Sequence, residues 1–206
     1  MEQRTPEWFA VRAGKVTASR LGDLTAKTKT GSAASRANYM AQLICERMTG
    51  MPQSSFSNAA MEWGTAQEPI ARAHFEARMG VFVKEVGFMS HPTIENAGAS
   101  PDGLLDDDES IVEFKCPNTA THIETLLGQE IDKKYILQIQ WQLACTGRKK
   151  AYFCSFDPRL PEHLQLFIKE VERDDSLIAE LEEEVRKFLA ELEEKCNQLK
   201  GLENAR

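Results

Sequence analysis

The stretch from Ser100 to Lys115 reads SPDGLLDDDESIVEFK and predicts a β-hairpin with charged side chains at one end. Apolar residues on both sides of the acidic AspAspAspGlu turn favour two short strands. Glu113 and Lys115 are two residues apart in the second strand, so both side chains point to one face, while Phe114 points to the other face and can enter the core. Because the turn folds the first strand back beside the second, Asp102 approaches Glu113 across the hairpin.

This arrangement of charges predicts a particular chemistry. Two carboxylates that converge at one point form a site of hard oxygen ligands, which suits Mg²⁺ or Mn²⁺ with water and a substrate phosphate in the other positions. The ammonium of Lys115 would orient or help deprotonate the attacking water and offset the charge that builds on the phosphate. Asp102, Glu113 and Lys115 therefore predict metal-assisted hydrolysis of a phosphodiester.

The same residues also have a purely structural interpretation. Alternating Glu and Lys on an exposed strand is ordinary cross-strand charge pairing, and ProAspGly is an ordinary turn. However, the run IleValGluPheLys is apolar apart from its two charges. Charges inserted in a buried strand usually serve a function, which favours the catalytic interpretation.

Length and composition bound the class of protein. With 206 residues, of which 42% are apolar, the chain is long enough for one well-buried core. The five cysteines are scattered without zinc spacing or a clustered set of iron–sulfur ligands, so we expect a reduced, cytoplasmic protein in which Cys116 packs beneath the site. No run approaches the roughly 20 apolar residues of a membrane span, and the N-terminus lacks the pattern of an export signal.

The net charge of −7 argues against a surface that binds nucleic acid everywhere, because phosphate contacts need Lys and Arg. Residues 174–206 carry ten acidic and five basic side chains, so most of this excess lies at the C-terminal end. The first 173 residues are close to neutral, and a basic groove within them is compatible with the composition.

Periodicity predicts an α/β chain with a mixed sheet flanked by helices. We expect a helix, a turn and a short helix over 5–24, then a mobile basic loop over 26–35. Further helices are expected over 35–48, 60–79, 122–127 and 134–145, a meander of about three strands over 81–115, and strands over 151–156 and 164–169. A long acidic helix with an apolar stripe follows. We assign residues 1–173 to one domain and residues 174–206 to an amphipathic helix that packs on it or at a subunit contact.

Five short motifs follow one another along the chain. They are ArgAlaGlyLysValThrAlaSer (12–19), TrpGly (63–64) with Glu68, SerProAspGly (100–103), GluPheLysCysPro (113–117) and TyrIleLeuGlnIleGln (135–140). Together they resemble the phage lambda exonuclease or YqaJ-type viral recombinase family of the PD-(D/E)XK nuclease superfamily, over roughly residues 5–170. The resemblance implies a PD-(D/E)XK restriction-endonuclease-like core.

The resemblance also implies roles at the reacting centre. Asp102 and Glu113 would bind the metals together with the backbone carbonyl of Phe114. Glu68 would complete the shell of a second metal, although its other interpretation is a solvated helical glutamate. Gln138 would lie beside Lys115 at the reacting phosphate.

A pocket for the terminal 5′ phosphate would be formed by Arg12, Ser19 and Ser100. Guanidinium and hydroxyl donors suit a phosphate dianion. Trp8, one helical turn before Arg12, would support that arginine or anchor its helix in the core, and we favour core packing.

Three further positions are candidate DNA contacts. Met61 matches the place of an apolar wedge that separates the terminal base pair, but it could equally fill the core. Lys27 or Lys29 would supply a neighbouring basic contact from the loop.

The implied activity is that of a Mg²⁺-dependent 5′-to-3′ exonuclease on double-stranded DNA ends. Family members are ring-shaped homotrimers that act processively and leave 3′ overhangs for a single-strand annealing protein in phage recombination. Two alternatives stay open. One is a related endonuclease or repair nuclease of the same superfamily, and the other is a non-catalytic DNA-binding subunit that keeps the fold.

Overall fold

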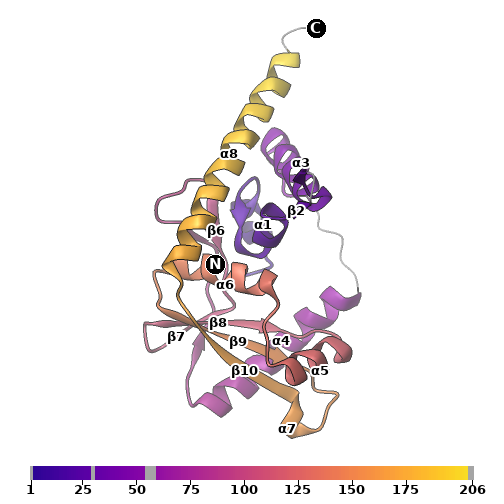
Figure 1. The fold of residues 1–206 in the computed structure, drawn as a ribbon, viewed down its shortest axis with the longest axis vertical. Coiled ribbons are helices and arrows are strands. Elements are labelled where there is room, and N and C mark those ends of the chain that lie inside the picture. The colour runs from indigo at the N-terminus through magenta and orange to yellow at the C-terminus, as the bar shows by residue number, and fades with distance from the viewer. Residues whose placement is uncertain (1, 29–30, 54–58, 204–206) are drawn as a thin grey trace.

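The computed structural model describes residues 2–28, 31–53 and 59–203 (Figure 1). Its centre is a five-stranded sheet in the order β10-β9-β8-β7-β4. The strands are β4 (Val83–Lys84), β7 (Gly103–Leu105), β8 (Ser110–Lys115), β9 (Lys150–Phe156) and β10 (Leu166–Glu172). Strands β8 and β9 pair in parallel, and the other neighbours in this sheet pair antiparallel. The prediction of a mixed sheet is therefore confirmed.

Helices cover both faces of this sheet, as predicted. On one face α4 (Ala59–Met79) buries Ala71 and Phe75 against Val112 and Phe114. On the other face α6 (Lys133–Thr146) packs with α5 (Thr119–Gly128) close by, and Ile111 of β8 joins this second cluster. Since side chains alternate along a strand, the residues of β8 that follow Ile111 at every second position face α6.

A second, smaller sheet joins β1 (Val16–Thr17), β6 (Ala97–Ala99) and β5 (Met89–Ser90). Around it lie α1 (Pro6–Arg12), the 3₁₀ turn η1 (Ala18–Arg20), α2 (Leu21–Leu24) and α3 (Ala34–Thr49). The long helix α8 (Asp175–Glu203) runs beside α3 and contacts α6 and α2 (Figure 1). Its apolar stripe is buried here: Val185, Phe188 and Leu192 belong to one core cluster with Tyr39 and Trp141.

The helix ends follow the sequence closely. Gly50 ends α3 in the left-handed region, with a φ of 68°, and Gly80 follows α4 with a φ of 67°. Both glycines were expected at these positions, since a residue without a Cβ carries no steric penalty there. In the described ranges, no helix combines the length and the apolarity that a membrane span requires.

Four predicted segments differ in the structure. The meander of about three strands is instead five short strands, β4 to β8, divided between the two sheets. The segment 5–24 contains β1 between its helices, and the loop 26–35 contains the paired strands β2 (Lys27–Thr28) and β3 (Gly31–Ser32). The strand predicted from 164 begins at Leu166, because α7 (Glu162–Gln165) precedes it. Strands of two or three residues are too short for a periodic pattern to mark them.

Candidate active site

Glu113 lies at the centre of a buried polar cluster between β8 and α6. Its side chain is 2% exposed. Lys115 Nζ and Gln138 Nε2 each donate to Glu113 Oε1 at 2.5 Å, and Gln142 Nε2 donates to Oε2 at 2.6 Å. The structure therefore brings Glu113, Lys115 and Gln138 together as the sequence predicted, and it adds Gln142.

Asp102 reaches the same cluster from the neighbouring strand. It directly precedes β7, whose Gly103 pairs with Val112 of β8. The amide of Phe114 donates to Asp102 Oδ2 at 2.7 Å, and the Phe114 side chain packs in the core against α4. The hairpin geometry expected from the sequence is present.

The electrostatics show that these carboxylates lie close together. Burial, followed by repulsion from Glu113 and Glu68, raises the pKa of Asp102 well above its usual range. Burial lowers the pKa of Lys115, but attraction to Glu113 and Asp102 outweighs this effect, so the net shift is upward. In this state Lys115 keeps its proton at neutral pH, which favours charge stabilisation and orientation over proton abstraction.

The donor set fits a divalent metal of the magnesium type. Asp102 and Glu113 offer carboxylate oxygens, and a cation between them would relieve the repulsion that raises the pKa of Asp102. Within the described residues, no group of three or more Asp, Glu, His or Cys side chains is placed to hold a metal ion. Mg²⁺ is commonly held by one or two carboxylates, with water and substrate phosphate completing its shell, so two carboxylates suffice.

Glu68 and Cys116 flank this cluster. Glu68 lies on α4 with 15% of its side chain exposed, and its carboxylate forms an ion pair with Arg4. Cys116 is buried beside the cluster, as expected, and burial, with repulsion from Glu68 and Asp102, raises the pKa of its thiol to about 12. The thiol therefore stays protonated at neutral pH and suits packing rather than redox chemistry.

A cavity of about 830 Å³ is lined by two of the three predicted phosphate-binding residues, and the third, Ser100, contacts one of them. Arg12 and Ser19 line the cavity. Arg12 Nη1 and Trp8 Nε1 each donate to Ser100 Oγ at 3.0 Å, and the guanidinium carbon of Arg12 lies 3.9 Å from the centre of the Trp8 ring. The preference for core packing of Trp8 was wrong, because this half-buried side chain lies under Arg12 and lines the cavity.

Arg12 is held in a charged state in this cavity. Burial lowers its pKa to about 10, partly offset by Tyr39 and Glu46. Glu46 is itself buried and fixed, since it accepts from the amide of Gly14 at 2.7 Å. A guanidinium with this pKa is fully cationic at neutral pH and is placed to bind an anion.

Of the three candidate DNA contacts, Met61 and Lys27 lie in different surroundings. Met61 is 48% exposed and lines the cavity, so the alternative that it fills the core is wrong. Lys27 is exposed and lies 3.9 Å from Glu184 of α8, and it is not among the residues that line this cavity. Lys29 lies outside the described residues. The DNA-contact roles of all three stay predictions.

Two residues of this region were missed by the sequence analysis. Gln142 follows Gln138 by one helical turn, and this i, i+4 spacing was the available signal, since it places both amides on one face of α6. Arg4 precedes the first helix, and no local pattern marks it.

Comparison with known proteins agrees with this geometry. Residues 7–149 match the family model of the YqaJ-like viral recombinase domain. The chain belongs to this family. The YqaJ-like match includes α1 from its second residue, the cavity-lining residues other than Arg4, the Asp102–Lys115 hairpin and α6.

Solved structures extend the YqaJ-like match to nearly the whole chain. An alkaline exonuclease from Laribacter hongkongensis, LHK-Exo, is 53% identical, with a TM-score of 0.90 over 98% of this chain and 99% of that one. The same enzyme in complex with dAMP gives a TM-score of 0.91 at the same identity and coverage. A phage-related exonuclease from Haemophilus somnus 129PT, 16% identical, matches with a TM-score of 0.75 over 90% of this chain and 96% of that chain, and shares the fold. No curated protein sequence matches this chain. The fold is thus of the expected PD-(D/E)XK type.

Proposed function

We propose that this protein is a Mg²⁺-dependent exonuclease that degrades duplex DNA in the 5′-to-3′ direction and leaves 3′ single-stranded overhangs. Its class, a DNA exonuclease, follows from its family and from 53% identity to an alkaline exonuclease over almost the whole of both chains. The proposal of the metal rests on the carboxylates of the site, whereas the direction and the product rest on the family resemblance and are supported by the neighbouring cavity. Mn²⁺ is expected to substitute for Mg²⁺, since both prefer oxygen ligands.

One observation carries the proposal. Ser100, which contacts Arg12 in the cavity, and Asp102, which contacts the main chain beside Glu113, belong to the same SerProAspGly turn. Two extended residues span about 7 Å, so the turn fixes the cavity and the carboxylates at short range. A strand whose terminal 5′ phosphate occupies the cavity would therefore present its first internucleotide phosphate to the carboxylates, which favours release of 5′-mononucleotides.

Each side chain of the site would have a separate role in hydrolysis. Asp102 and Glu113 would hold the metal with the carbonyl of Phe114, and Glu68 would serve a second ion. When bound, Mg²⁺ supplies charge to the phosphate and lowers the pKa of a water molecule. Lys115 offsets negative charge on the phosphate from a fixed position beside Glu113, and Gln138 holds Glu113 in place.

The cavity supplies the basic surface that an acidic protein needs to bind DNA. Arg4, Arg12, Lys15 and Arg20 all line it, although the chain carries a net charge of −7. We further propose that three copies of the chain form a ring around the duplex. Such a ring would make digestion processive, because the enzyme could not leave the DNA between cleavage steps. The overhangs would be the substrate of a phage-type single-strand annealing protein.

The deciding experiment compares three duplexes in Mg²⁺: linear with 5′ phosphates, linear with 5′ hydroxyls, and covalently closed circles. We expect rapid loss of the phosphorylated linear DNA, slower loss of the hydroxyl form and intact circles. Equal cutting of circles would refute end dependence and favour the endonuclease alternative. Undigested linear DNA would instead support the non-catalytic alternative.

The Arg12→Ala variant tests the direction. Removing the guanidinium should reduce the preference for 5′-phosphorylated ends at least about tenfold, because a charge-assisted contact to the phosphate is lost. Digestion of 5′-hydroxyl ends should change much less. An unchanged end preference would contradict the assignment of the cavity to the terminal phosphate.

A further inference from the structure

The segment before α1 is fixed against the turn that links the two parts of the site. Gln3 Nε2 donates to the carbonyl of Val86 at 2.8 Å and to that of Pro101 at 2.9 Å. Pro101 lies between Ser100, which accepts from Arg12 of the cavity, and Asp102 of the carboxylate cluster. The next residue, Arg4, is therefore held at the boundary between the two.

Arg4 has an unusual backbone conformation at this boundary. Its φ is 66°, in the left-handed region that residues with a Cβ adopt at a free-energy cost. Such conformations persist where the surroundings enforce them and are concentrated at functional sites. The two hydrogen bonds of Gln3 supply that constraint on one side.

The guanidinium of Arg4 contacts both parts of the site. Arg4 lines the cavity together with Arg12, and its guanidinium forms an ion pair with Glu68, a carboxylate on α4 that repels Asp102. The Arg4 side chain is 44% exposed, so solvent screens the pair and weakens it. A phosphate offers the guanidinium an equivalent partner, because it accepts two parallel hydrogen bonds as a carboxylate does.

We infer that Arg4 is a DNA-binding residue that exchanges Glu68 for an internucleotide phosphate of the substrate strand when DNA enters. This inference rests on the proposed function, since it places the phosphate between the cavity and the carboxylates. It assigns Arg4 a role distinct from that of Arg12: Arg12 binds the terminal phosphate, whereas Arg4 binds the chain next to it. The exchange also frees Glu68 in the DNA-bound protein.

The test measures binding without catalysis, so that it does not depend on whether the protein digests DNA. Binding of a short fluorescent duplex is followed by anisotropy in EDTA over a series of salt concentrations, with 5′-phosphate and with 5′-hydroxyl ends. For Arg4→Ala we expect a dissociation constant roughly three- to tenfold higher on both ends, and a salt slope smaller by about one. Arg4→Lys should recover part of the affinity, since it keeps the charge but not the planar fork.

Arg186→Ala is the matched control. Arg186 is also a half-exposed arginine near a glutamate, 3.7 Å from Glu182, but it lies on the acidic helix α8 and is not among the residues that line the cavity. Its removal should leave the affinity and the salt slope unchanged. Thermal melting of all variants would check that each is folded.

Two outcomes would overturn the inference. If Arg4→Ala binds both duplexes with wild-type affinity and slope, Arg4 contacts no phosphate. If affinity falls only for 5′-phosphorylated ends, Arg4 belongs to the terminal pocket with Arg12. Failure of the proposed function is seen separately, as a wild-type protein that leaves linear duplex intact in Mg²⁺ or cuts circles.

Discussion

The carboxylate of Glu113 accepts hydrogen bonds from three side chains on two elements, although it is almost completely buried. A buried charge is costly unless its hydrogen bonds are met and a counter-charge is close. Lys115 supplies the counter-charge, and Gln138 and Gln142 supply the amide donors. The arrangement fixes Glu113 before any substrate arrives, which is what a metal ligand requires.

Gln142 is the member of this set whose role is easiest to isolate. Gln142→Leu keeps the approximate volume but removes the donor to Glu113 Oε2. We expect kcat to fall roughly tenfold with KM nearly unchanged, because loss of this hydrogen bond loosens Glu113, the proposed metal ligand, and leaves the proposed DNA contacts in place. Steady-state digestion of phosphorylated linear duplex measures both constants.

Gln140→Leu provides the control from the same helix. Gln140 is equally buried, but it donates to the carbonyl of Glu172 and accepts from the amide of Asp174, away from Glu113. This change should lower the free energy of unfolding by about 1–3 kcal/mol while kcat is kept. Equal kcat losses in both variants would mean that Gln142 acts through stability alone.

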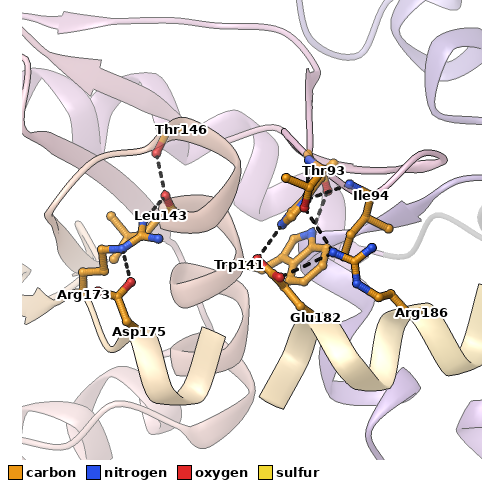
Figure 2. Close-up of polar contacts among 11 residues, drawn as sticks. Thr93, Ile94, Trp141, Leu143, Thr146, Arg173, Asp175, Glu182 and Arg186 are labelled. Atoms are coloured by element: carbon orange, nitrogen blue, oxygen red, sulfur yellow. Dashed lines mark hydrogen bonds and ion pairs between the residues drawn. The ribbon is translucent and has the colours of Figure 1, made fainter. Parts of the chain in front are cut away.

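At the scale of elements, His91 and Arg173, from two different segments, tie α8 to the body. His91, just after β5, stacks on Trp141 of α6 with ring centres 4.7 Å apart, and its Nε2 lies 3.3 Å from Glu182 of α8. Arg173 donates to the carbonyl of Leu143 and to Asp175 at the start of α8 (Figure 2). These contacts join the small sheet, α6 and the C-terminal helix into one unit.

The His91 contact predicts acid sensitivity. His91 Nδ1 accepts hydrogen bonds from the amides of Thr93 and Ile94, so protonation of Nδ1 would break both bonds. Burial lowers the pKa of His91; Arg186 lowers it further, and Glu182 partly opposes both. The unfolded chain therefore binds this proton more readily, and stability should fall as the pH drops below about 6.5.

Melting temperatures between pH 8 and pH 5 test this expectation. His91→Asn keeps an acceptor for the two amides but cannot be protonated. The variant should lose less stability than the wild type over the lower part of this range. Parallel pH profiles for the two proteins would contradict the assignment to His91.

The small sheet depends on the absence of a side chain at one position. A Cβ on Gly98 would lie 2.4 Å from the carbonyl oxygen of Met89 and 2.4 Å from Cζ of Phe88. Gly98→Ala should therefore destabilise the protein by about 3 kcal/mol, since the paired backbone of β5 must shift. Denaturant unfolding measures this change.

Gly128→Ala is the comparison for that measurement. Gly128 ends α5, and a Cβ there would meet no heavy atom of the described residues within 4 Å. This variant should be neutral or up to about 1 kcal/mol more stable, because alanine favours the helix. Wild-type stability in Gly98→Ala would show that β5 and β6 are less tightly paired than the structure has them.

At the scale of the whole molecule, charge is unevenly distributed. The helix α8 carries much of the negative charge, while arginines gather around the cavity. These features are compatible with the proposed ring, in which basic surfaces face the DNA.

The ring predicts a definite mass in solution. A homotrimer of the 23.2 kDa chain would have a mass of about 70 kDa by light scattering after size exclusion. The mass should persist on dilution, because a processive enzyme must stay closed around its substrate. A monomeric mass in the presence and absence of DNA would contradict the ring while leaving the chemistry of the site unaffected.

The sequence by itself determined the local geometry of the reacting centre. Alternation of side chains along β8 placed Glu113 and Lys115 on one face of the strand and Phe114 in the core. The turn before β8 brought Asp102 beside the end of the strand that carries these residues. These relations depend on a period of two residues and one tight turn, which local sequence encodes. The division 1–173 and 174–206 stays a prediction, since the buried stripe of α8 fits packing on the domain without defining a boundary.

Only the tertiary structure decided which distant residues complete the site. Gln142 meets Glu113 across 29 positions, and Arg4 meets Glu68 across 64. Trp8 was expected in the core, but its indole N–H donates to Ser100, which lies 92 positions away in the sequence. Such contacts depend on how helices pack on the sheet, and no periodic pattern within a short window specifies that packing.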